Sequence, residues 1–254
     1  DFDTRRSLDQ ITYAFADLGK FRGFLYLQPG KEYELKLPPK GQLSQAQRLN
    51  PFFQPEEILL GIRNETPQGL NPLIRDFDDA FNDQLNNYAV RLITRKDRSL
   101  ANAIIDLMET EFPSRDEFVS HHKQYRYAKL KALTSRGSLE TIIDRHFSDQ
   151  PVFFQMPAYW ETFKDVFKGF GRKLFERLEG TGPLNFEKLV ATIRGDTLYQ
   201  RTSFSETLAL WSIYKSYHEK IIPKKLTIHL LDEAAQQAQT QGTRSTAGNI
   251  DVRR

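Results

Sequence analysis

Apolar residues recur every three or four positions along most of the chain, which is the spacing that places them on one face of an α-helix. The strongest pattern covers residues 157–178, where aromatic and leucine side chains form one stripe and basic residues occupy other positions. We interpret this stripe as core, and Gly169 and Gly171 within it as a kink or a close helix contact. Similar spacing predicts helices over residues 5–18, 73–93, 98–111, 114–137, 138–147, 185–194 and 203–222, with a short one beginning at Glu56.

Two of these helices open with the capping-box pattern, in which a serine is followed three residues later by a glutamate. The pairs are Ser114 with Glu117 and Ser203 with Glu206. In a capping box the serine hydroxyl accepts a hydrogen bond from the backbone N–H three residues on, and the glutamate accepts one from the N–H of the serine. We therefore expect helices to begin directly after Ser114 and Ser203.

One short region near the N-terminus has an alternating pattern instead. In FLYLQPGKEYELKL, residues 24–37, apolar side chains alternate with other residues on both sides of a Pro-Gly turn at positions 29 and 30. This pattern predicts a β-hairpin over about residues 21–37. Near the other end, LTIHLL at 226–231 fits a strand or a helix equally well.

The predicted fold class is therefore mainly α, a multi-helical orthogonal or bundle-like array with a small N-terminal β-hairpin, and α+β is the alternative. One domain is predicted over residues 1–235, and a sub-boundary in the connector near 64–72 is the alternative. Residues 236–254 are rich in Gln, Thr, Ser and Gly and hold almost no apolar side chain. Such a segment buries too little surface to order itself, so a flexible polar tail is predicted there.

Composition excludes several kinds of function. The chain has 254 residues, no cysteine and a net charge of +3. Disulfides, thiolate metal sites and cysteine nucleophiles are therefore excluded, and anion binding must come from local clustering of charge. No apolar run approaches the roughly 20 residues that span a bilayer, and no signal-peptide pattern opens the chain, so we expect a cytoplasmic protein. The sequence begins at Asp1 and not at Met, which leaves a targeting or anchoring segment upstream open.

The densest basic cluster is HHKQYRYAKLKALTSRG, residues 121–137, with five lysines or arginines, two histidines and two tyrosines. On a helix most of the basic side chains fall within a sector roughly 140° wide, but Val119, Leu130 and Leu133 point into the same sector. Either long basic side chains run along a helix packed on two sides, or a positive groove faces a phosphate backbone or an acidic peptide. The candidate anion- or nucleic-acid-binding residues are His122, Lys123, Tyr125, Arg126, Lys129 and Arg136.

Glu34 and Lys36 form an E-x-K pair on the second predicted strand, where both side chains share one face. The pair resembles that of the PD-(D/E)xK metal-dependent nucleases, in which carboxylates hold Mg²⁺ and the lysine helps to activate water. Those enzymes use a further acid upstream, whereas the preceding strand has none and the nearest aspartate, Asp17, lies at a predicted helix end. The alternative is an exposed strand face with no catalytic role.

No other catalytic or cofactor-binding pattern is present, because the sequence lacks a P-loop, G-x-G-x-x-G, G-x-S-x-G and H-E-x-x-H. The acidic run over residues 76–83 is interpreted as the solvated start of a helix. Five histidines and aspartates near the turn at residue 137 lack a helical ligand spacing, so no metal site, cofactor or catalytic residue is predicted from them. They are His121, His122, Asp144, His146 and Asp149.

These observations favour a non-enzymatic interaction or assembly subunit of a larger complex, of a nucleoprotein or secretion type, with protein partners expected and the oligomeric state left open. The alternatives are a nucleic-acid-binding protein that uses residues 121–136 and a metal-dependent nuclease that uses Glu34 and Lys36. No family is recognised. YRYAKLKAL followed by SRG, with a later Trp and Gly-Arg, resembles cytosolic components of type IV coupling complexes at scattered positions, and no residue role follows from this.

Overall fold

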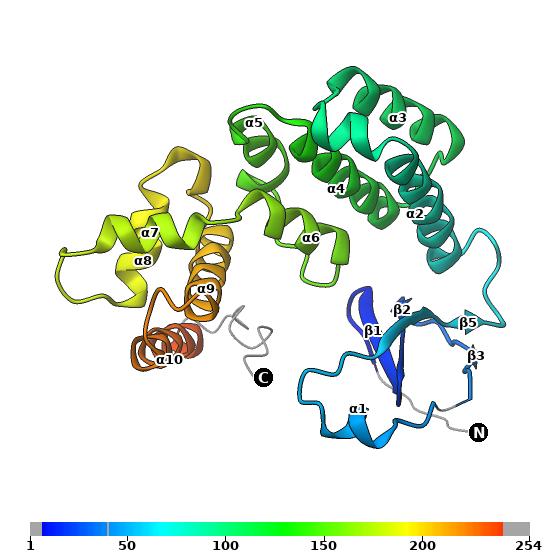
Figure 1. Ribbon diagram of the computed structural model, residues 1–254, viewed down its shortest axis with the longest axis horizontal. Helices are drawn as coiled ribbons and strands as arrows, with labels where there is room; N and C mark the ends of the chain where they lie inside the picture. The colour runs from blue at the N-terminus through cyan, green and yellow to red at the C-terminus, as the bar shows by residue number, and fades with distance from the viewer. Residues whose placement is uncertain (1–6, 40, 241–254) are drawn as a thin grey trace. The chain divides into compact units, whose positions relative to one another are not determined.

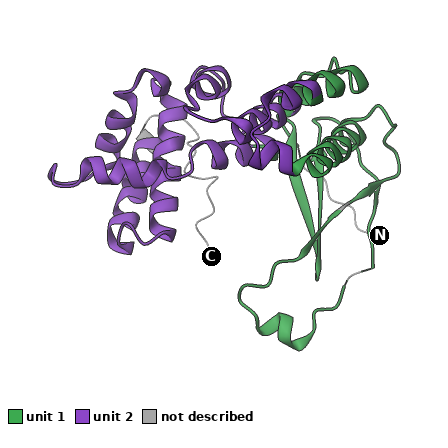
Figure 2. Ribbon diagram, turned by 45° about the horizontal axis from the view of Figure 1, so that its top comes forward, with its two compact units in different colours: residues 1–89, 104–122, 155–157 green, residues 90–103, 123–154, 158–254 purple. Residues whose placement is uncertain are grey.

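The structure is a computed structural model that describes residues 7–39 and 41–240 (Figure 1). It is mainly α-helical with a small N-terminal β part, which confirms the predicted fold class. The chain divides into two compact units (Figure 2). Unit 1 comprises residues 1–89, 104–122 and 155–157, and unit 2 comprises residues 90–103, 123–154 and 158–254.

The connector near 64–72 lies inside unit 1, and the sub-boundary expected there stays a prediction. Three helices contribute residues to both units, namely α3 (Arg98–Glu111), α4 (Glu117–Thr134) and, by its first residue alone, α6 (Pro157–Val166). The division between the units cuts through these continuous helices, so it does not show how many domains the chain has. The single domain expected over residues 1–235 therefore stays a prediction. Residues 241–254 of the predicted flexible tail lie outside the described residues, whereas residues 236–240 are helical.

The β part of unit 1 begins with an antiparallel pair, β1 (Thr12–Leu18) and β2 (Phe21–Leu27). Gly19 lies in the turn between them with a φ of 75°, a conformation that glycine adopts without steric cost. β4 (Glu56–Leu59) pairs in parallel with β2, so the sheet order is β1-β2-β4. Two further short strands pair with each other, β3 (Leu35–Lys36) and β5 (Gly61–Ile62).

Three predictions for this region were wrong. No helix forms over residues 7–18 of the helix expected at 5–18, and residues 12–18 are strand β1; residues 5 and 6 lie outside the described residues. The short helix expected from Glu56 is strand β4. In place of the hairpin expected across the Pro-Gly turn, β2 pairs with β1, which precedes it, and β3 pairs with β5. The apolar spacing of residues 8, 11, 15 and 18 fits a helix, but Thr12, Tyr13 and Phe15 are β-branched or aromatic and favour a pleated surface. Pairing with β2 along the whole strand then decides the conformation.

The side chain of Asn71 connects the sheet to the first long helix of unit 1, α2 (Leu70–Asn87). Its Oδ1 accepts a hydrogen bond from the N–H of Tyr26 at 2.6 Å, and its Nδ2 donates to the carbonyl of Tyr26 at 3.0 Å. Tyr26 also packs with Leu70, Ile74 and Val119 in a small core. The amide thus occupies both backbone groups of a strand residue, as a neighbouring strand would.

The helices follow the apolar periodicity closely in the middle and C-terminal parts of the chain. LTIHLL, which was ambiguous, is helical. The helix predicted over 157–178 is two helices, because Gly169 adopts a φ of 76° and interrupts it. Besides α2, α3 and α4, the α-helices are α1 (Gln45–Leu49), α5 (Glu140–Ile143), α6 (Pro157–Val166), α7 (Phe170–Leu178), α8 (Phe186–Arg194), α9 (Thr202–His218) and α10 (Lys224–Thr240). There are also π-helical turns η1 (Val90–Thr94) and η2 (Asp144–Ser148) and a 3₁₀ turn η3 (Thr197–Tyr199).

Both capping-box predictions were wrong. At the start of α4, the carboxylate of Asp116 accepts the hydrogen bond from the N–H of Val119 at 3.0 Å, and Ser114 accepts one from the N–H of Asp116. At the start of α9 the N-cap is Arg201, which makes no side-chain cap bond. An aspartate two residues after the serine supplies a charged acceptor at the helix end, and so α4 begins later than the pattern indicates.

The core of unit 2 is aromatic, which confirms the interpretation of the stripe over 157–178. Phe147 is fully buried and lies within 6.1 Å, centroid to centroid, of five other aromatic rings. Helix α9 contacts α7, α8 and α10 in the same unit (Figure 1). The rings around Phe147 are those of Tyr125, Tyr159, Phe163, Phe167 and Phe204.

The close contact expected at Gly171 is present between α7 and α9. A β-carbon at this position would lie 2.9 Å from Oγ of Ser216 and 3.0 Å from the carbonyl oxygen of Ser212. We expect Gly171→Ala to lower the free energy of unfolding by about 1 kcal/mol, since the clash outweighs alanine's better helix propensity. Urea denaturation measures this, with Gly137→Ala as the control, because nothing lies within 4 Å of a β-carbon there. Equal stability of the two variants would contradict the close approach.

Candidate functional site

The six residues predicted to bind anions lie on α4 or just after it, and most are not at the surface. Four are buried, namely His122, Lys123, Tyr125 and Arg126. Lys129 is partly buried, and only Arg136 is exposed. The packed-helix interpretation of this stretch therefore fits the structure better than a groove that uses all six side chains.

Two of the buried or partly buried cations are neutralised within unit 2 by Glu161 on α6. Its Oε2 lies 3.2 Å from Nη1 of Arg126 and 2.8 Å from Nζ of Lys129. Asp165, one turn further along α6, lies 3.9 Å from the same lysine. These ion pairs attach α4 to α6. They also offset the positive charge of Arg126 and Lys129, which would otherwise attract a phosphate.

His122 has a structural partner in unit 1. Its Nε2 lies 2.9 Å from Oδ1 of Asp78 on α2, and its ring packs edge-on against Phe77. Asp78 belongs to the acidic run that was interpreted as solvated. Through its contact with His122 it also connects α2 to α4. Within residues 7–39 and 41–240, no three side chains of His, Asp or Glu are placed to hold a metal ion together.

The residues that a metal-dependent nuclease would use, Glu34, Lys36 and Asp17, do not share a common contact in the described part of the chain. Glu34 precedes β3 and Lys36 ends it, and both side chains are exposed. Asp17, on β1, forms an ion pair with Arg22 at 2.7 Å. The exposed and half-buried positions alternate from residue 32 to residue 36, which favours the exposed strand face over a catalytic site.

A pocket that sequence reasoning did not predict lies between η1 and α3 in unit 2, with a volume of about 550 Å³. We call it the Lys96 pocket. Nζ of Lys96 donates to the carbonyl of Leu133 at 2.6 Å, and Nη2 of Arg136 donates to the carbonyl of Arg95 at 2.8 Å, so the loop is fixed against the end of α4. The lining residues are Arg95, Lys96, Asp97, Arg98, Ser99 and Arg136.

The Lys96 pocket has a strong excess of positive charge. Its one carboxylate, Asp97, accepts a hydrogen bond from the N–H of Leu100 and pairs with Arg91 at 2.6 Å. These two interactions, the backbone N–H first, hold the pKa of Asp97 below its usual value, so the group stays ionised and already paired. Two of the four cations in the lining, Lys96 and Arg136, donate to neutral backbone carbonyls, so these bonds do not offset the positive charge.

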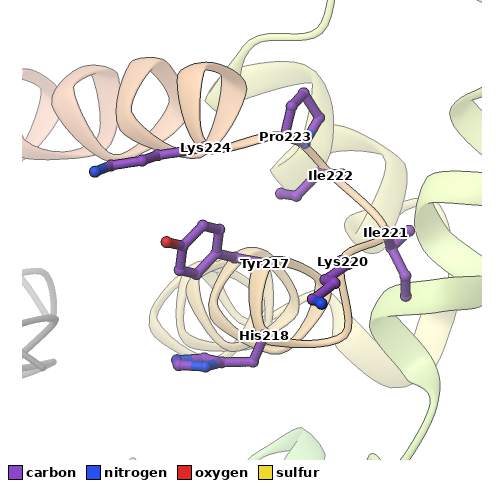
Figure 3. A pocket seen from close by; sticks show the side chains of 7 residues that line it. All are labelled: Tyr217, His218, Lys220, Ile221, Ile222, Pro223 and Lys224. Carbon is purple, nitrogen blue, oxygen red and sulfur yellow. The ribbon is translucent and has the colours of Figure 1, made fainter.

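A second pocket, of about 620 Å³, lies at the turn between α9 and α10 and is called the Lys220 pocket (Figure 3). Two lysines, a histidine and a tyrosine line it together with an apolar wall, and the lining contains no carboxylate. In Figure 3 the side chains of Tyr217, His218 and Lys224 point to the same side. The lining residues are Tyr217, His218, Lys220, Ile221, Ile222, Pro223 and Lys224.

These features define a mainly α-helical protein with a small β part and two cation-lined pockets in its larger unit. Comparison with protein-family models, curated proteins and solved structures finds no significant match. Among the helices that the structure describes, none is long and apolar enough to cross a membrane.

Proposed function

We propose that the protein is a non-enzymatic interaction or assembly subunit of a larger complex. Unit 1 exposes large apolar side chains from strand β1 and from the segment around helix α1, and this observation carries the proposal. Phe52 is 86% exposed, Leu49 is 75% exposed and Phe15 is 59% exposed. Leu49 and Phe52 belong to one short segment, residues 44–53, which we call the apolar segment.

The position of β1 in the sheet supports the same role. β1 is an edge strand, because the sheet order is β1-β2-β4, and Phe15 projects from it in an exposed position. An edge strand presents backbone groups that an extended segment of another protein can pair with. We infer a protein partner that contributes apolar side chains to the apolar segment and, in the same assembly, covers β1.

Capture of partners from cells tests this role. We expect Leu49→Ser with Phe52→Ser to weaken binding of a captured and then purified partner by about tenfold or more, because central apolar contacts dominate interface energies. The matched control is Ile228→Ser, an exposed apolar residue of α10, which is 48% exposed and is expected to leave binding unchanged. Binding that survives in the double variant would contradict the assignment of the apolar segment.

A second candidate function, nucleic-acid binding, is favoured by the charge of the Lys96 pocket. Arg95 and Arg98 are exposed there, next to Arg136 from the stretch that the sequence singled out. Guanidinium groups bind phosphate with paired hydrogen bonds, and the lining holds no aromatic ring for stacking. We propose recognition of the phosphate backbone without sequence preference.

Fluorescence anisotropy with a labelled single-stranded oligonucleotide tests the second candidate. With three phosphate contacts, affinity should fall about 20-fold between 50 and 200 mM salt. Arg95→Glu with Arg98→Glu should weaken binding about tenfold or more and reduce the salt dependence. Lys164→Glu with Lys168→Glu, an equal charge change at exposed positions of unit 2, is the control. Equal loss in both double variants would indicate general charge attraction and contradict a site at the Lys96 pocket.

A further inference from the structure

Two lysines adopt a backbone conformation that normally belongs to glycine. Among residues 7–39 and 41–240, Lys96 and Lys220 are the non-glycine residues with positive φ, at 53° and 58°. In this conformation a β-carbon crowds the following carbonyl oxygen, which glycine avoids. Gly180, with a φ of 74°, takes the corresponding position after α7.

Lys220 lies directly after the C-cap of α9, where the chain closes the helix. Its N–H donates to the carbonyl of Tyr217 at 3.0 Å, and the N–H of Ile221 donates to the carbonyl of Ser216 at 2.8 Å. This is the Schellman arrangement, in which glycine is strongly preferred at the position of Lys220. The helix end therefore requires the backbone conformation but gives no reason for a lysine side chain.

The side chains of the two lysines differ in their contacts. Lys96 donates to the carbonyl of Leu133, so its side chain has a structural role. In the described part of the chain, the ammonium group of Lys220 has no hydrogen bond or ion pair, and it lines the Lys220 pocket (Figure 3). A lysine kept where glycine is preferred, without a side-chain contact that compensates for the strain, points to a function for the side chain.

The other groups at the Lys220 pocket indicate what the ammonium faces. Lys224, the first residue of α10, adds a second exposed cation. The neighbouring carboxylate of Glu219 is engaged elsewhere, by Arg172 at 3.5 Å and Lys215 at 3.6 Å, and is not part of the lining. The pocket thus combines two cations with an apolar and aromatic wall.

We propose that the Lys220 pocket binds a phosphate group joined to a planar aromatic ring, as in a nucleotide. Lys220 holds the phosphate, Lys224 adds positive charge to the lining, and the ring lies against Tyr217 and the apolar wall of Ile222 and Pro223. The ligand is a free mononucleotide or a nucleotide within a strand, which share this chemistry. This inference is independent of the assembly role, since it uses only residues of unit 2.

Calorimetric titration of the full chain with AMP, adenosine, inorganic phosphate and an eight-nucleotide adenine RNA tests the proposal. We expect AMP to bind with a Kd of about 1 mM or tighter, and adenosine and phosphate to bind at least about tenfold more weakly. Tyr217→Leu should weaken AMP binding by about tenfold, through lost stacking. Lys164→Gln, which removes an exposed lysine outside the pocket, should leave it unchanged.

Lys220→Gly is the sharpest variant, because stability and binding should move in opposite directions. Glycine relieves the backbone strain, so the Tm should rise by about 2 to 4 °C, while loss of the ammonium should weaken AMP binding by about tenfold. A more stable variant with unchanged AMP affinity would overturn the proposal, and so would absence of AMP binding by the wild type. If the RNA binds and its binding is lost in Tyr217→Leu and Lys220→Gly, the natural ligand is a nucleotide within a strand. AMP binding without RNA binding assigns the free nucleotide.

Discussion

Phe147→Ala is expected to lower the free energy of unfolding by about 3 to 5 kcal/mol, the usual cost of truncating a fully buried phenylalanine. Phe147 has no exposed surface and contacts the rings of five aromatic residues in unit 2. Its position in the π-helical turn η2 places it among rings from α4, α6 and α9, so the cavity would open at the centre of the core.

Urea denaturation followed by circular dichroism measures this effect. The control is Phe52→Ala, because Phe52 is almost fully exposed and its loss should change stability by less than about 0.5 kcal/mol. A cost for Phe147→Ala no larger than that of the control would mean that the rings do not pack as described.

The stability of the protein is expected to fall as the pH decreases from about 6.5 to 4, partly through His146. Burial, with smaller effects of Arg145 and Lys131, lowers the pKa of His146 to about 4. In the unfolded chain its pKa is about 6.5, so between these values only the unfolded state binds the proton. The stabilisation is complete above about pH 6.5 and is lost as the pH falls to 4.

His146→Gln isolates this contribution, since glutamine does not titrate. The wild type should lose about 2 kcal/mol more than the variant between pH 7 and pH 4, a value reduced for the partial exposure of the ring. Denaturant midpoints measured at half-unit pH intervals give both curves, and NMR titration of the histidine gives its pKa directly. Parallel curves for the two proteins would contradict the lowered pKa.

The sequence predicted the helices best where one apolar stripe had a single interpretation. Residues 98–111 were predicted as a helix and form α3 with the same bounds. Residues 5–18 carried a helical spacing as well, but pairing with residues 21–27 makes part of that segment a strand. The energy of that pairing belongs to two segments together, so the spacing within one of them could not reveal it.

The candidate site shows the same limit. Arg126 and Lys129 looked available for an anion, yet both pair with Glu161, which lies more than thirty residues further along the chain. Arg136 was predicted to bind anions, and it does line the Lys96 pocket. The other cations of that pocket come from the loop at residues 95–98, RKDR, which is itself a short basic run. That run was the available signal for the Lys96 pocket, although its closeness to Arg136 depends on the tertiary fold.

Amide hydrogen exchange of the protein alone and bound to its captured partner tests the assembly role most directly. The proposal predicts slower exchange in the bound state within the apolar segment, residues 44–53, and along β1, where a partner would cover Leu49, Phe52 and Phe15. Exchange that stays unchanged in both regions, with slowing confined to unit 2, would contradict it.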